Sequence, residues 1–120
     1  MALHLNIAKE FSPVPVGRYR SDGDNSGQAF RDDILYPKIC AAIKNQDTLK
    51  VDFTGIHGLS SSFLEEAFGG LVREKGLNPD EILRILIFLP EKSYFDAYIK
   101  LTKKYINKAR PMEPEAEHFA

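Results

Sequence analysis

The stretch that says most about this chain is residues 51–71, which read VDFTGIHGLSSSFLEEAFGGL. Alternating apolar and polar residues at its start predict a short β-strand, and a glycine-containing turn follows. Ser62 and Glu65 have the S-x-x-E spacing of a capping box, which predicts that a helix begins at the serine cluster. A helix start presents free N–H groups and partial positive charge, so it favours an anion placed there. A serine at this point is therefore either a plain helix cap or a candidate phosphorylation site.

The composition is typical of one globular domain. A chain of 120 residues can bury a single core. Its net charge of −1 provides no overall basic surface for nucleic acid, and no apolar run is long enough to predict a transmembrane helix. The N-terminal residues lack the pattern of a secretory signal, and Cys40 is the only cysteine, which excludes an internal disulfide. We therefore expect a cytoplasmic protein that binds neither nucleic acid nor membrane.

Three segments have the pattern of main strands. Residues 3–7 and 49–53 alternate apolar and polar side chains, and the nearly all-apolar run 83–89 predicts a central strand covered on both faces. Residues 11–27 are rich in proline and glycine and read as a loop, in which residues 16–20 could pair as a short edge strand. Strands that alternate with helices predict an α/β fold, a small sheet with helices packed on it.

Two helices are expected to flank the second strand. Ser26 can cap the first, and Pro37 interrupts its apolar pattern, so we expect a kink or a division near Tyr36. The second begins at the serine cluster, where Gly69 and Gly70 would weaken an isolated helix. Their use is expected to be the close approach of a neighbouring element.

A last helix is predicted before the C-terminal residues. Its apolar row contains Phe95, Ile99, Thr102 and Ile106, whereas Lys100, Lys103, Lys104 and Lys108 are expected on the solvent side. These lysines are either a solvated face or a surface that could bind the acidic tail of another copy. Residues 1–110 are thus predicted to form the domain and residues 111–120 a flexible acidic tail.

Two segments resemble a known family. Residues 18–23 (RYRSDG) and 61–71 (SSFLEEAFGGL) are similar to segments of a bacterial STAS-like family of unassigned function, which is distantly similar to the anti-sigma factor antagonists. The resemblance covers roughly residues 3–109. It implies a small STAS-like mixed sheet with helices packed on it and a non-enzymatic regulatory role in protein–protein interaction and signalling.

The resemblance also implies a switch and a partner. In the antagonists, a kinase of the histidine-kinase-like ATPase superfamily phosphorylates a serine at this helix start, and by position that serine is Ser62, with Ser61 just before it. The chain departs from the antagonists' pattern, because Ser60 replaces an acidic residue and Phe63 replaces a glycine. The implied partner is such an ATPase or kinase, or a regulator that it controls.

Other functions remain open at this stage. Two arginines in a glycine-containing loop could clamp a phosphate, which would make the domain a small-ligand sensor for an anion or nucleotide; alternatively, an Arg–Asp pair holds the loop. Asp52 either accepts N–H groups of the following turn or forms an exposed acidic contact. We expect no catalytic residue, metal or cofactor, because neither a nucleophile elbow nor metal-ligand spacing is present. The residues expected to meet a partner or an anion are Arg18, Tyr19, Arg20, Asp22, Asp52, His57, Ser60, Phe63 and Glu66.

Overall fold

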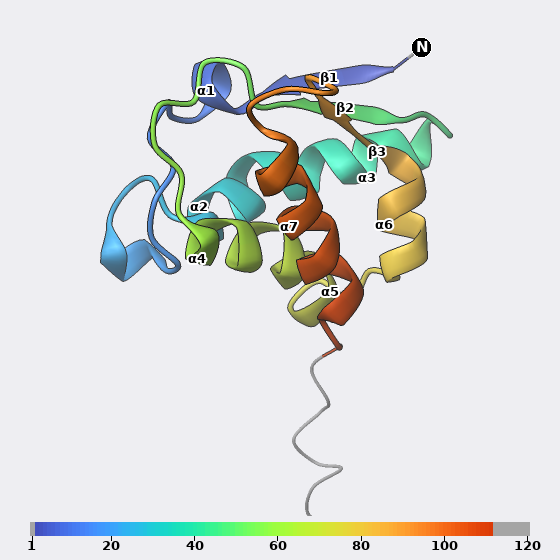
Figure 1. Ribbon diagram of the computed structural model, residues 1–120. Coiled ribbons are helices and arrows are strands. Elements are labelled where there is room, and N and C mark those ends of the chain that lie inside the picture. The colour runs from blue at the N-terminus through green and yellow to red at the C-terminus, as the bar shows by residue number, and fades with distance from the viewer. Residues whose placement is uncertain (1, 112–120) are drawn as a thin grey trace, which may run out of the picture.

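The computed structural model describes residues 2–111, which form an α/β fold around a three-stranded sheet (Figure 1). The strands are β1 (Leu3–Asn6), β2 (Leu49–Asp52) and β3 (Leu86–Leu89), in the order β1-β2-β3. Both pairings are parallel, with Val51 of β2 opposite Leu5 and Phe88. The predicted α/β class is confirmed, but the described strands form a parallel rather than a mixed sheet.

The helices cover mainly one face of this sheet. Figure 1 shows α3, α4, α5 and α7 below the strands, and buried residues alternate with half-buried residues along β2 and β3. The short helix α1 (Ile7–Glu10) follows β1 directly. The core between sheet and helices contains four phenylalanines with no exposed surface, Phe30, Phe53, Phe63 and Phe68.

Two expectations about strands were wrong. The run 83–89 is divided between helix α6 (Pro79–Ile85) and β3, and β3 lies at an edge of the described sheet rather than at its centre. The side chain of Asn78 accepts the N–H groups of Asp80 and Glu81 and caps α6, so a helix precedes the strand in this segment. Residues 16–20 form no strand, and the 3₁₀ turn η1 (Arg20–Asp22) follows them.

The first long helix contains a wide turn. Ser26 caps it as predicted, and it runs through α2 (Gly27–Phe30), the π-helical turn η2 (Arg31–Leu35) and α3 (Tyr36–Lys44). Pro37 lies in the first turn of α3, two residues after the last π-helical residue, Leu35. The helix is therefore not divided near Tyr36, and the irregularity before Pro37 is a π-helical turn over residues 31–35.

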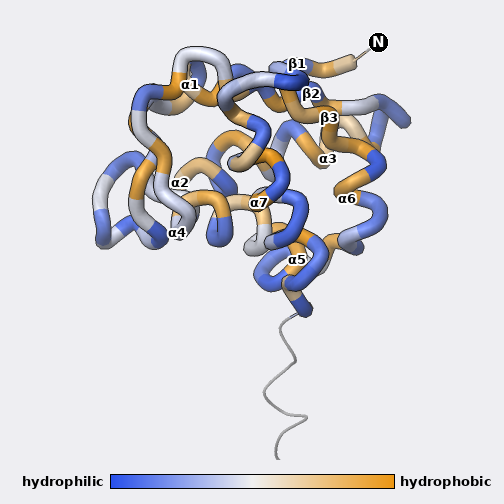
Figure 2. Tube along the Cα trace, viewed as in Figure 1, coloured by the Kyte–Doolittle hydropathy of each residue, from blue (hydrophilic) through white to orange (hydrophobic). Residues whose placement is uncertain are grey.

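The other helices pack around this one. The helix that follows β2 consists of α4 (Ser61–Leu64), the π-helical turn η3 (Glu65–Gly69) and α5 (Gly70–Arg73). The last helix, α7 (Asp96–Lys108), packs on η3 and, as predicted, buries Ile99, Thr102 and Ile106. Hydrophobic and hydrophilic residues alternate along α7 in Figure 2, as in a helix with one buried side.

The predicted tail, residues 111–120, lies outside the described residues except for Pro111. Among residues 2–111, no helix has both the length and the apolar character needed to cross a membrane.

Candidate functional site

The helix after β2 begins at Ser61, and Ser60 caps it. The Oγ atom of Ser60 accepts the N–H of Phe63 at 3.1 Å, and it also accepts the N–H of Gly17 at 3.3 Å. The capping box predicted from Ser62 and Glu65 was therefore wrong. Three consecutive serines offer competing caps, and the contact with Gly17, which the sequence does not reveal, favours Ser60.

The other two serines differ in their access to solvent. Ser61 is exposed, and its hydroxyl makes no hydrogen bond to any residue between 2 and 111. Ser62 is half-buried, and its Oγ lies 3.2 Å from the Oγ of Ser60. Ser61 therefore presents the accessible hydroxyl in the first turn, where backbone N–H groups have no partner within the helix.

Two loops form the surroundings of Ser61. The backbone N–H of His57 donates to the carbonyl of Pro13 at 2.7 Å, and the N–H of Ser60 donates to Pro15 at 3.3 Å. Figure 1 shows the chain before α2 beside the loop that enters α4. This arrangement places an exposed apolar segment, which includes Val14 and Val16, next to the serine loop. We call the exposed residues Val14, Val16, Tyr19, His57 and Ser61 the serine surface.

The two loop arginines do not form an anion clamp. The guanidinium of Arg18 donates to Glu65 on the serine helix, whereas that of Arg20 pairs with both carboxylate oxygens of Asp33, at 2.7 and 3.2 Å. Burial acts to lower the pKa of Arg18, but its carboxylate partners raise the pKa above the ordinary value. The carboxylate of Asp22 accepts the N–H groups of Arg18 and Tyr19, so it holds the loop in shape.

Glu66 belongs to a buried ion cluster rather than to the surface. Its Oε2 atom lies 2.6 Å from Nη1 of Arg31, and the same nitrogen donates to the carbonyl oxygen of Glu66 at 2.9 Å. Arg73 and Arg18 reach its other oxygen at 3.2 and 3.4 Å. With only 3% of its surface exposed, Glu66 cannot meet a partner, which corrects that expectation.

Glu65 completes this cluster at the protein surface. Its Oε2 atom pairs with Arg73 at 2.8 Å, and its Oε1 atom pairs with Arg18. Burial acts to raise the pKa of Glu65, but the hydrogen bonds from Arg73 and Arg18 lower the pKa below its ordinary value. Sequence reasoning missed Arg31 and Arg73. The only sequence signal for this cluster was the pair Gly69 and Gly70, which predicted the close approach of another element. That element is the side chain of Arg31, because a Cβ at Gly70 would lie 2.2 Å from its Nη1 atom.

Phe63 lies in the core and was also misplaced on the partner surface. It has no exposed surface, and its ring centroid is 5.5 Å from that of Phe30 and 6.1 Å from that of Phe11. The side chain of Phe63, which stands where the antagonists have a glycine, therefore points into the core. It does not obstruct the approach to the serines.

Asp52 lies at the end of β2 and holds the turn that follows. Its carboxylate accepts the N–H of Thr54 at 2.9 Å. Burial acts to raise the pKa of Asp52, whereas the hydrogen bonds from Thr54 and the charge of His4 lower it, and the net pKa lies below the ordinary value. This geometry matches the structural interpretation of Asp52.

The comparison with protein families adds one finding. The sequence model of a STAS-like domain of unknown function (DUF4325) matches residues 26–91. The chain belongs to this STAS-like family. The STAS-like match includes the serine cluster and the ion cluster from Arg31 to Arg73, but it ends before α7 and begins after Arg18. No curated protein and no solved structure matches the chain.

Proposed function

We propose that this STAS-like domain is a non-enzymatic regulatory module whose serine surface binds a protein partner, and that phosphorylation of Ser61 controls the binding. The observation that carries the proposal is the exposed, unbonded hydroxyl of Ser61 at a helix start, next to the exposed Val14 and Val16. Apolar side chains beside a modifiable hydroxyl suit a contact that charge can abolish. Ser62 is the second candidate, since it is half-buried.

The proposed kinase belongs to the histidine-kinase-like ATPase superfamily. It would transfer the γ-phosphoryl group of ATP to the Oγ atom of Ser61, with release of ADP and of the hydroxyl proton. The product carries nearly two negative charges at neutral pH. The partial positive charge of the helix start favours these charges, so the fold tolerates the modified residue.

The phosphate would also change the neighbouring ion pairs. Ser61 and Glu65 are four residues apart on one helix, so their side chains lie on the same face, about 6 Å apart at Cβ. A phosphate on Ser61 would repel the carboxylate of Glu65 and compete for Arg18, which already contacts that carboxylate. The expected result is a movement of Arg18 towards the phosphate, which changes both the charge and the shape of the serine surface.

The alternative of a small-anion sensor has less support. Each of the two loop arginines is already paired with a carboxylate, Arg18 with Glu65 and Arg20 with Asp33. An anion would have to displace one of these carboxylates.

The test compares the wild-type chain with Ser61→Ala and Ser62→Ala. Each is incubated with ATP and a lysate of the source cells, recovered, and weighed intact by mass spectrometry. We expect the mass of one phosphate on the wild type and on Ser62→Ala, and none on Ser61→Ala. A phosphate that persists on Ser61→Ala would assign the switch to another residue.

Partner binding is tested by measuring how much of each protein captured from the lysate by the unmodified chain also binds the variants. Ser61→Asp should weaken the capture at least tenfold, whereas Ser61→Ala should bind like the wild type, because it removes only an exposed hydroxyl. Equal capture by wild type, Ser61→Ala and Ser61→Asp would contradict the proposed control by charge.

A further inference from the structure

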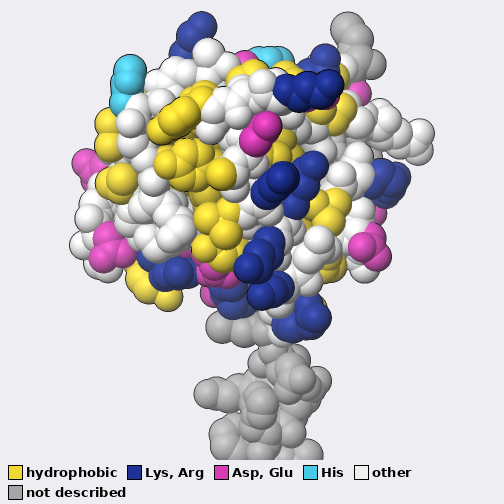
Figure 3. Space-filling model, in the orientation of Figure 1, with side chains coloured by type: hydrophobic (Ala, Val, Ile, Leu, Met, Phe, Trp, Pro, Cys, Tyr) yellow, Lys and Arg dark blue, Asp and Glu magenta, His cyan; other side chains and the backbone are white. Residues whose placement is uncertain are grey.

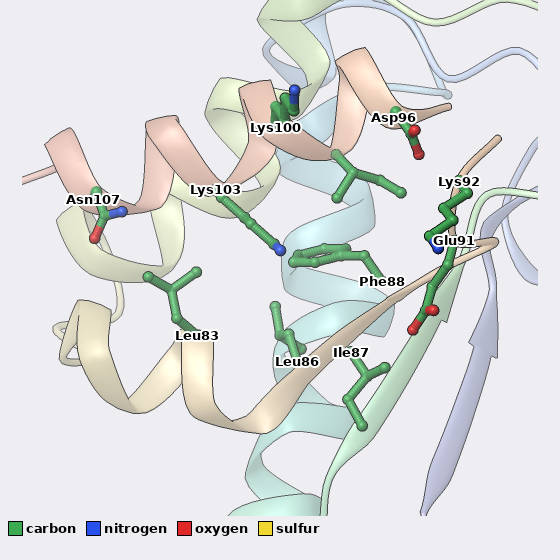
Figure 4. A pocket seen from close by; sticks show the side chains of 11 residues that line it. Leu83, Leu86, Ile87, Phe88, Glu91, Lys92, Asp96, Lys100, Lys103 and Asn107 are labelled. Carbon is green, nitrogen blue, oxygen red and sulfur yellow. The ribbon is translucent and has the colours of Figure 1, made fainter. Parts of the chain in front are cut away.

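A groove runs between β3, α6 and α7, away from the serine surface. Its volume is about 630 Å³, and its apolar lining includes Leu83, Leu86, Ile87 and Phe88 (Figure 4). In Figure 4 the side chain of Lys103 extends from α7 towards the ring of Phe88, and the ammonium nitrogen lies 6.0 Å from the ring centroid. The groove therefore combines an apolar floor with a rim that carries three lysines, Lys92, Lys100 and Lys103, and two carboxylates, Glu91 and Asp96.

The lysines of α7 are unpaired within the described part of the chain. Lys100, Lys103, Lys104 and Lys108 are exposed, and none forms an ion pair with a residue between 2 and 111. Figure 3 shows this basic surface along α7, beside hydrophobic side chains. The arginines of the ion cluster, by contrast, are all paired. The α7 lysines thus form an unneutralised basic surface, which we call the lysine stripe. Lys100 and Lys103 also line the groove, whereas Lys104 and Lys108 lie outside its lining.

The sequence after α7 complements this groove. Residues 112–120 read MEPEAEHFA, with glutamates at every second position followed by a phenylalanine at position 119. In an extended chain, residues two positions apart lie on one side at a spacing of about 6.6 Å. Lysines four positions apart on α7 are spaced by about 6 Å along the helix. Extended glutamates can therefore match successive lysines of the stripe.

We propose that residues 112–120 bind in this groove of the same molecule, extended and antiparallel to α7. Glu113, Glu115 and Glu117 pair with the lysine stripe, and Phe119 packs on the apolar floor beside Phe88. The bound segment covers the open edge of β3 and neutralises α7. The inference is independent of the proposed phosphorylation, because the groove contains no residue of the serine surface.

The length of the chain permits this path. Eight residues from Pro111 to Phe119 span up to about 26 Å when extended. From Lys108 back to Lys100 the distance along α7 is about 12 Å. The difference leaves room for a reversal of direction after Lys108 and before Glu113, so that the three glutamates follow the turn. Attachment to α7 also gives the segment a local concentration in the millimolar range, which favours binding within one molecule over binding to a second copy.

The experiment measures where the segment lies in the full chain. Cys40, which is exposed, is replaced by serine, and a nitroxide label is attached to Ala120→Cys. We expect the amide NMR signals of β3 and of the first two turns of α7 to lose most of their intensity. The matched control carries Glu113→Gln, Glu115→Gln and Glu117→Gln with the same label, and it should broaden only signals near the end of α7.

Charge reversal provides a second test. Lys100→Glu combined with Lys104→Glu should abolish the broadening of β3, and Glu113→Lys with Glu117→Lys should restore it in that background. Both lysines are exposed, so the domain is expected to remain folded, which circular dichroism checks.

Two results would overturn the proposal. One is broadening of β3 that is unchanged by the three glutamine substitutions. The other comes from a mixture of two chains, one isotope-labelled without nitroxide and one nitroxide-labelled without isotopes. Broadening of the isotope-labelled chain in this mixture would show that the segment binds a second copy.

Discussion

Removal of the Glu66 carboxylate is expected to destabilise the domain by about 3 kcal/mol. Breaking a buried ion pair generally costs about 3–5 kcal/mol, because the remaining charge stays buried without compensation. The side chains of Glu66 and Arg31 are each only 4% exposed, and their charged atoms are 2.6 Å apart. In Glu66→Ala, the guanidinium of Arg31 keeps the carboxylate of Asp32 at 2.9 Å and the backbone carbonyl of residue 66. These remaining contacts place the expected loss at the lower end of the range.

Glu65→Ala is the matched control. Glu65 is next in sequence and shares the partner Arg73, but its side chain is 22% exposed, so we expect a loss of about 1 kcal/mol. The double variant Arg31→Met with Glu66→Leu removes both buried charges and should recover most of the stability lost in Glu66→Ala. Urea unfolding followed by circular dichroism measures the free energies, with an unchanged m-value as the check of two-state behaviour. A loss in Glu66→Ala no larger than that in Glu65→Ala, or no recovery in the double variant, would refute the reasoning.

Three further predictions concern packing, capping and pH. Gly27→Ala should lower the free energy of unfolding by about 1–3 kcal/mol, because a Cβ there would lie 2.5 Å from the backbone oxygen of Phe63; a variant as stable as the wild type in urea would contradict this close approach. Ser60→Ala should cost about 1 kcal/mol, since it removes the helix cap, whereas Ser61→Ala should change stability by less than about 0.5 kcal/mol; equal losses in thermal unfolding would assign the cap differently. The folded-state pKa of Glu65 lies below its unfolded value, so its stabilising contribution is complete above about pH 4.3 and is lost as the pH falls through the folded pKa. Urea midpoints measured from neutral pH down to about pH 2 should therefore fall less steeply in Glu65→Gln, and identical slopes would exclude this contribution.

The segments that the sequence predicted correctly are those decided by local pattern. Alternation in residues 3–7 and 49–53 identified β1 and β2, and the spacing of apolar residues identified α7 and its buried row. Where local signals competed, the prediction failed. The run 83–89, which is apolar except for Arg84, fits either a buried helix or a strand.

The site shows the same division. The sequence placed a helix start at the serines, but the choice of Ser60 as the cap depends on a loop 43 residues earlier, through the N–H of Gly17. Access to Ser61 also depends on this packing. The assignment of Phe63 and Glu66 to the surface was wrong because the side of the helix that faces the core follows from contacts with α2 and η2.

The sequence by itself determined the α/β class, the strands before the two long helices and the existence of a helix start at the serine cluster. These features follow from propensities and periodicities that act over a few residues. Only the tertiary structure decided that three arginines, Arg18, Arg31 and Arg73, meet Glu65 and Glu66. Their pairing requires the packing of two π-helical turns against each other, and a buried charge has no local signature until the fold removes water from around it.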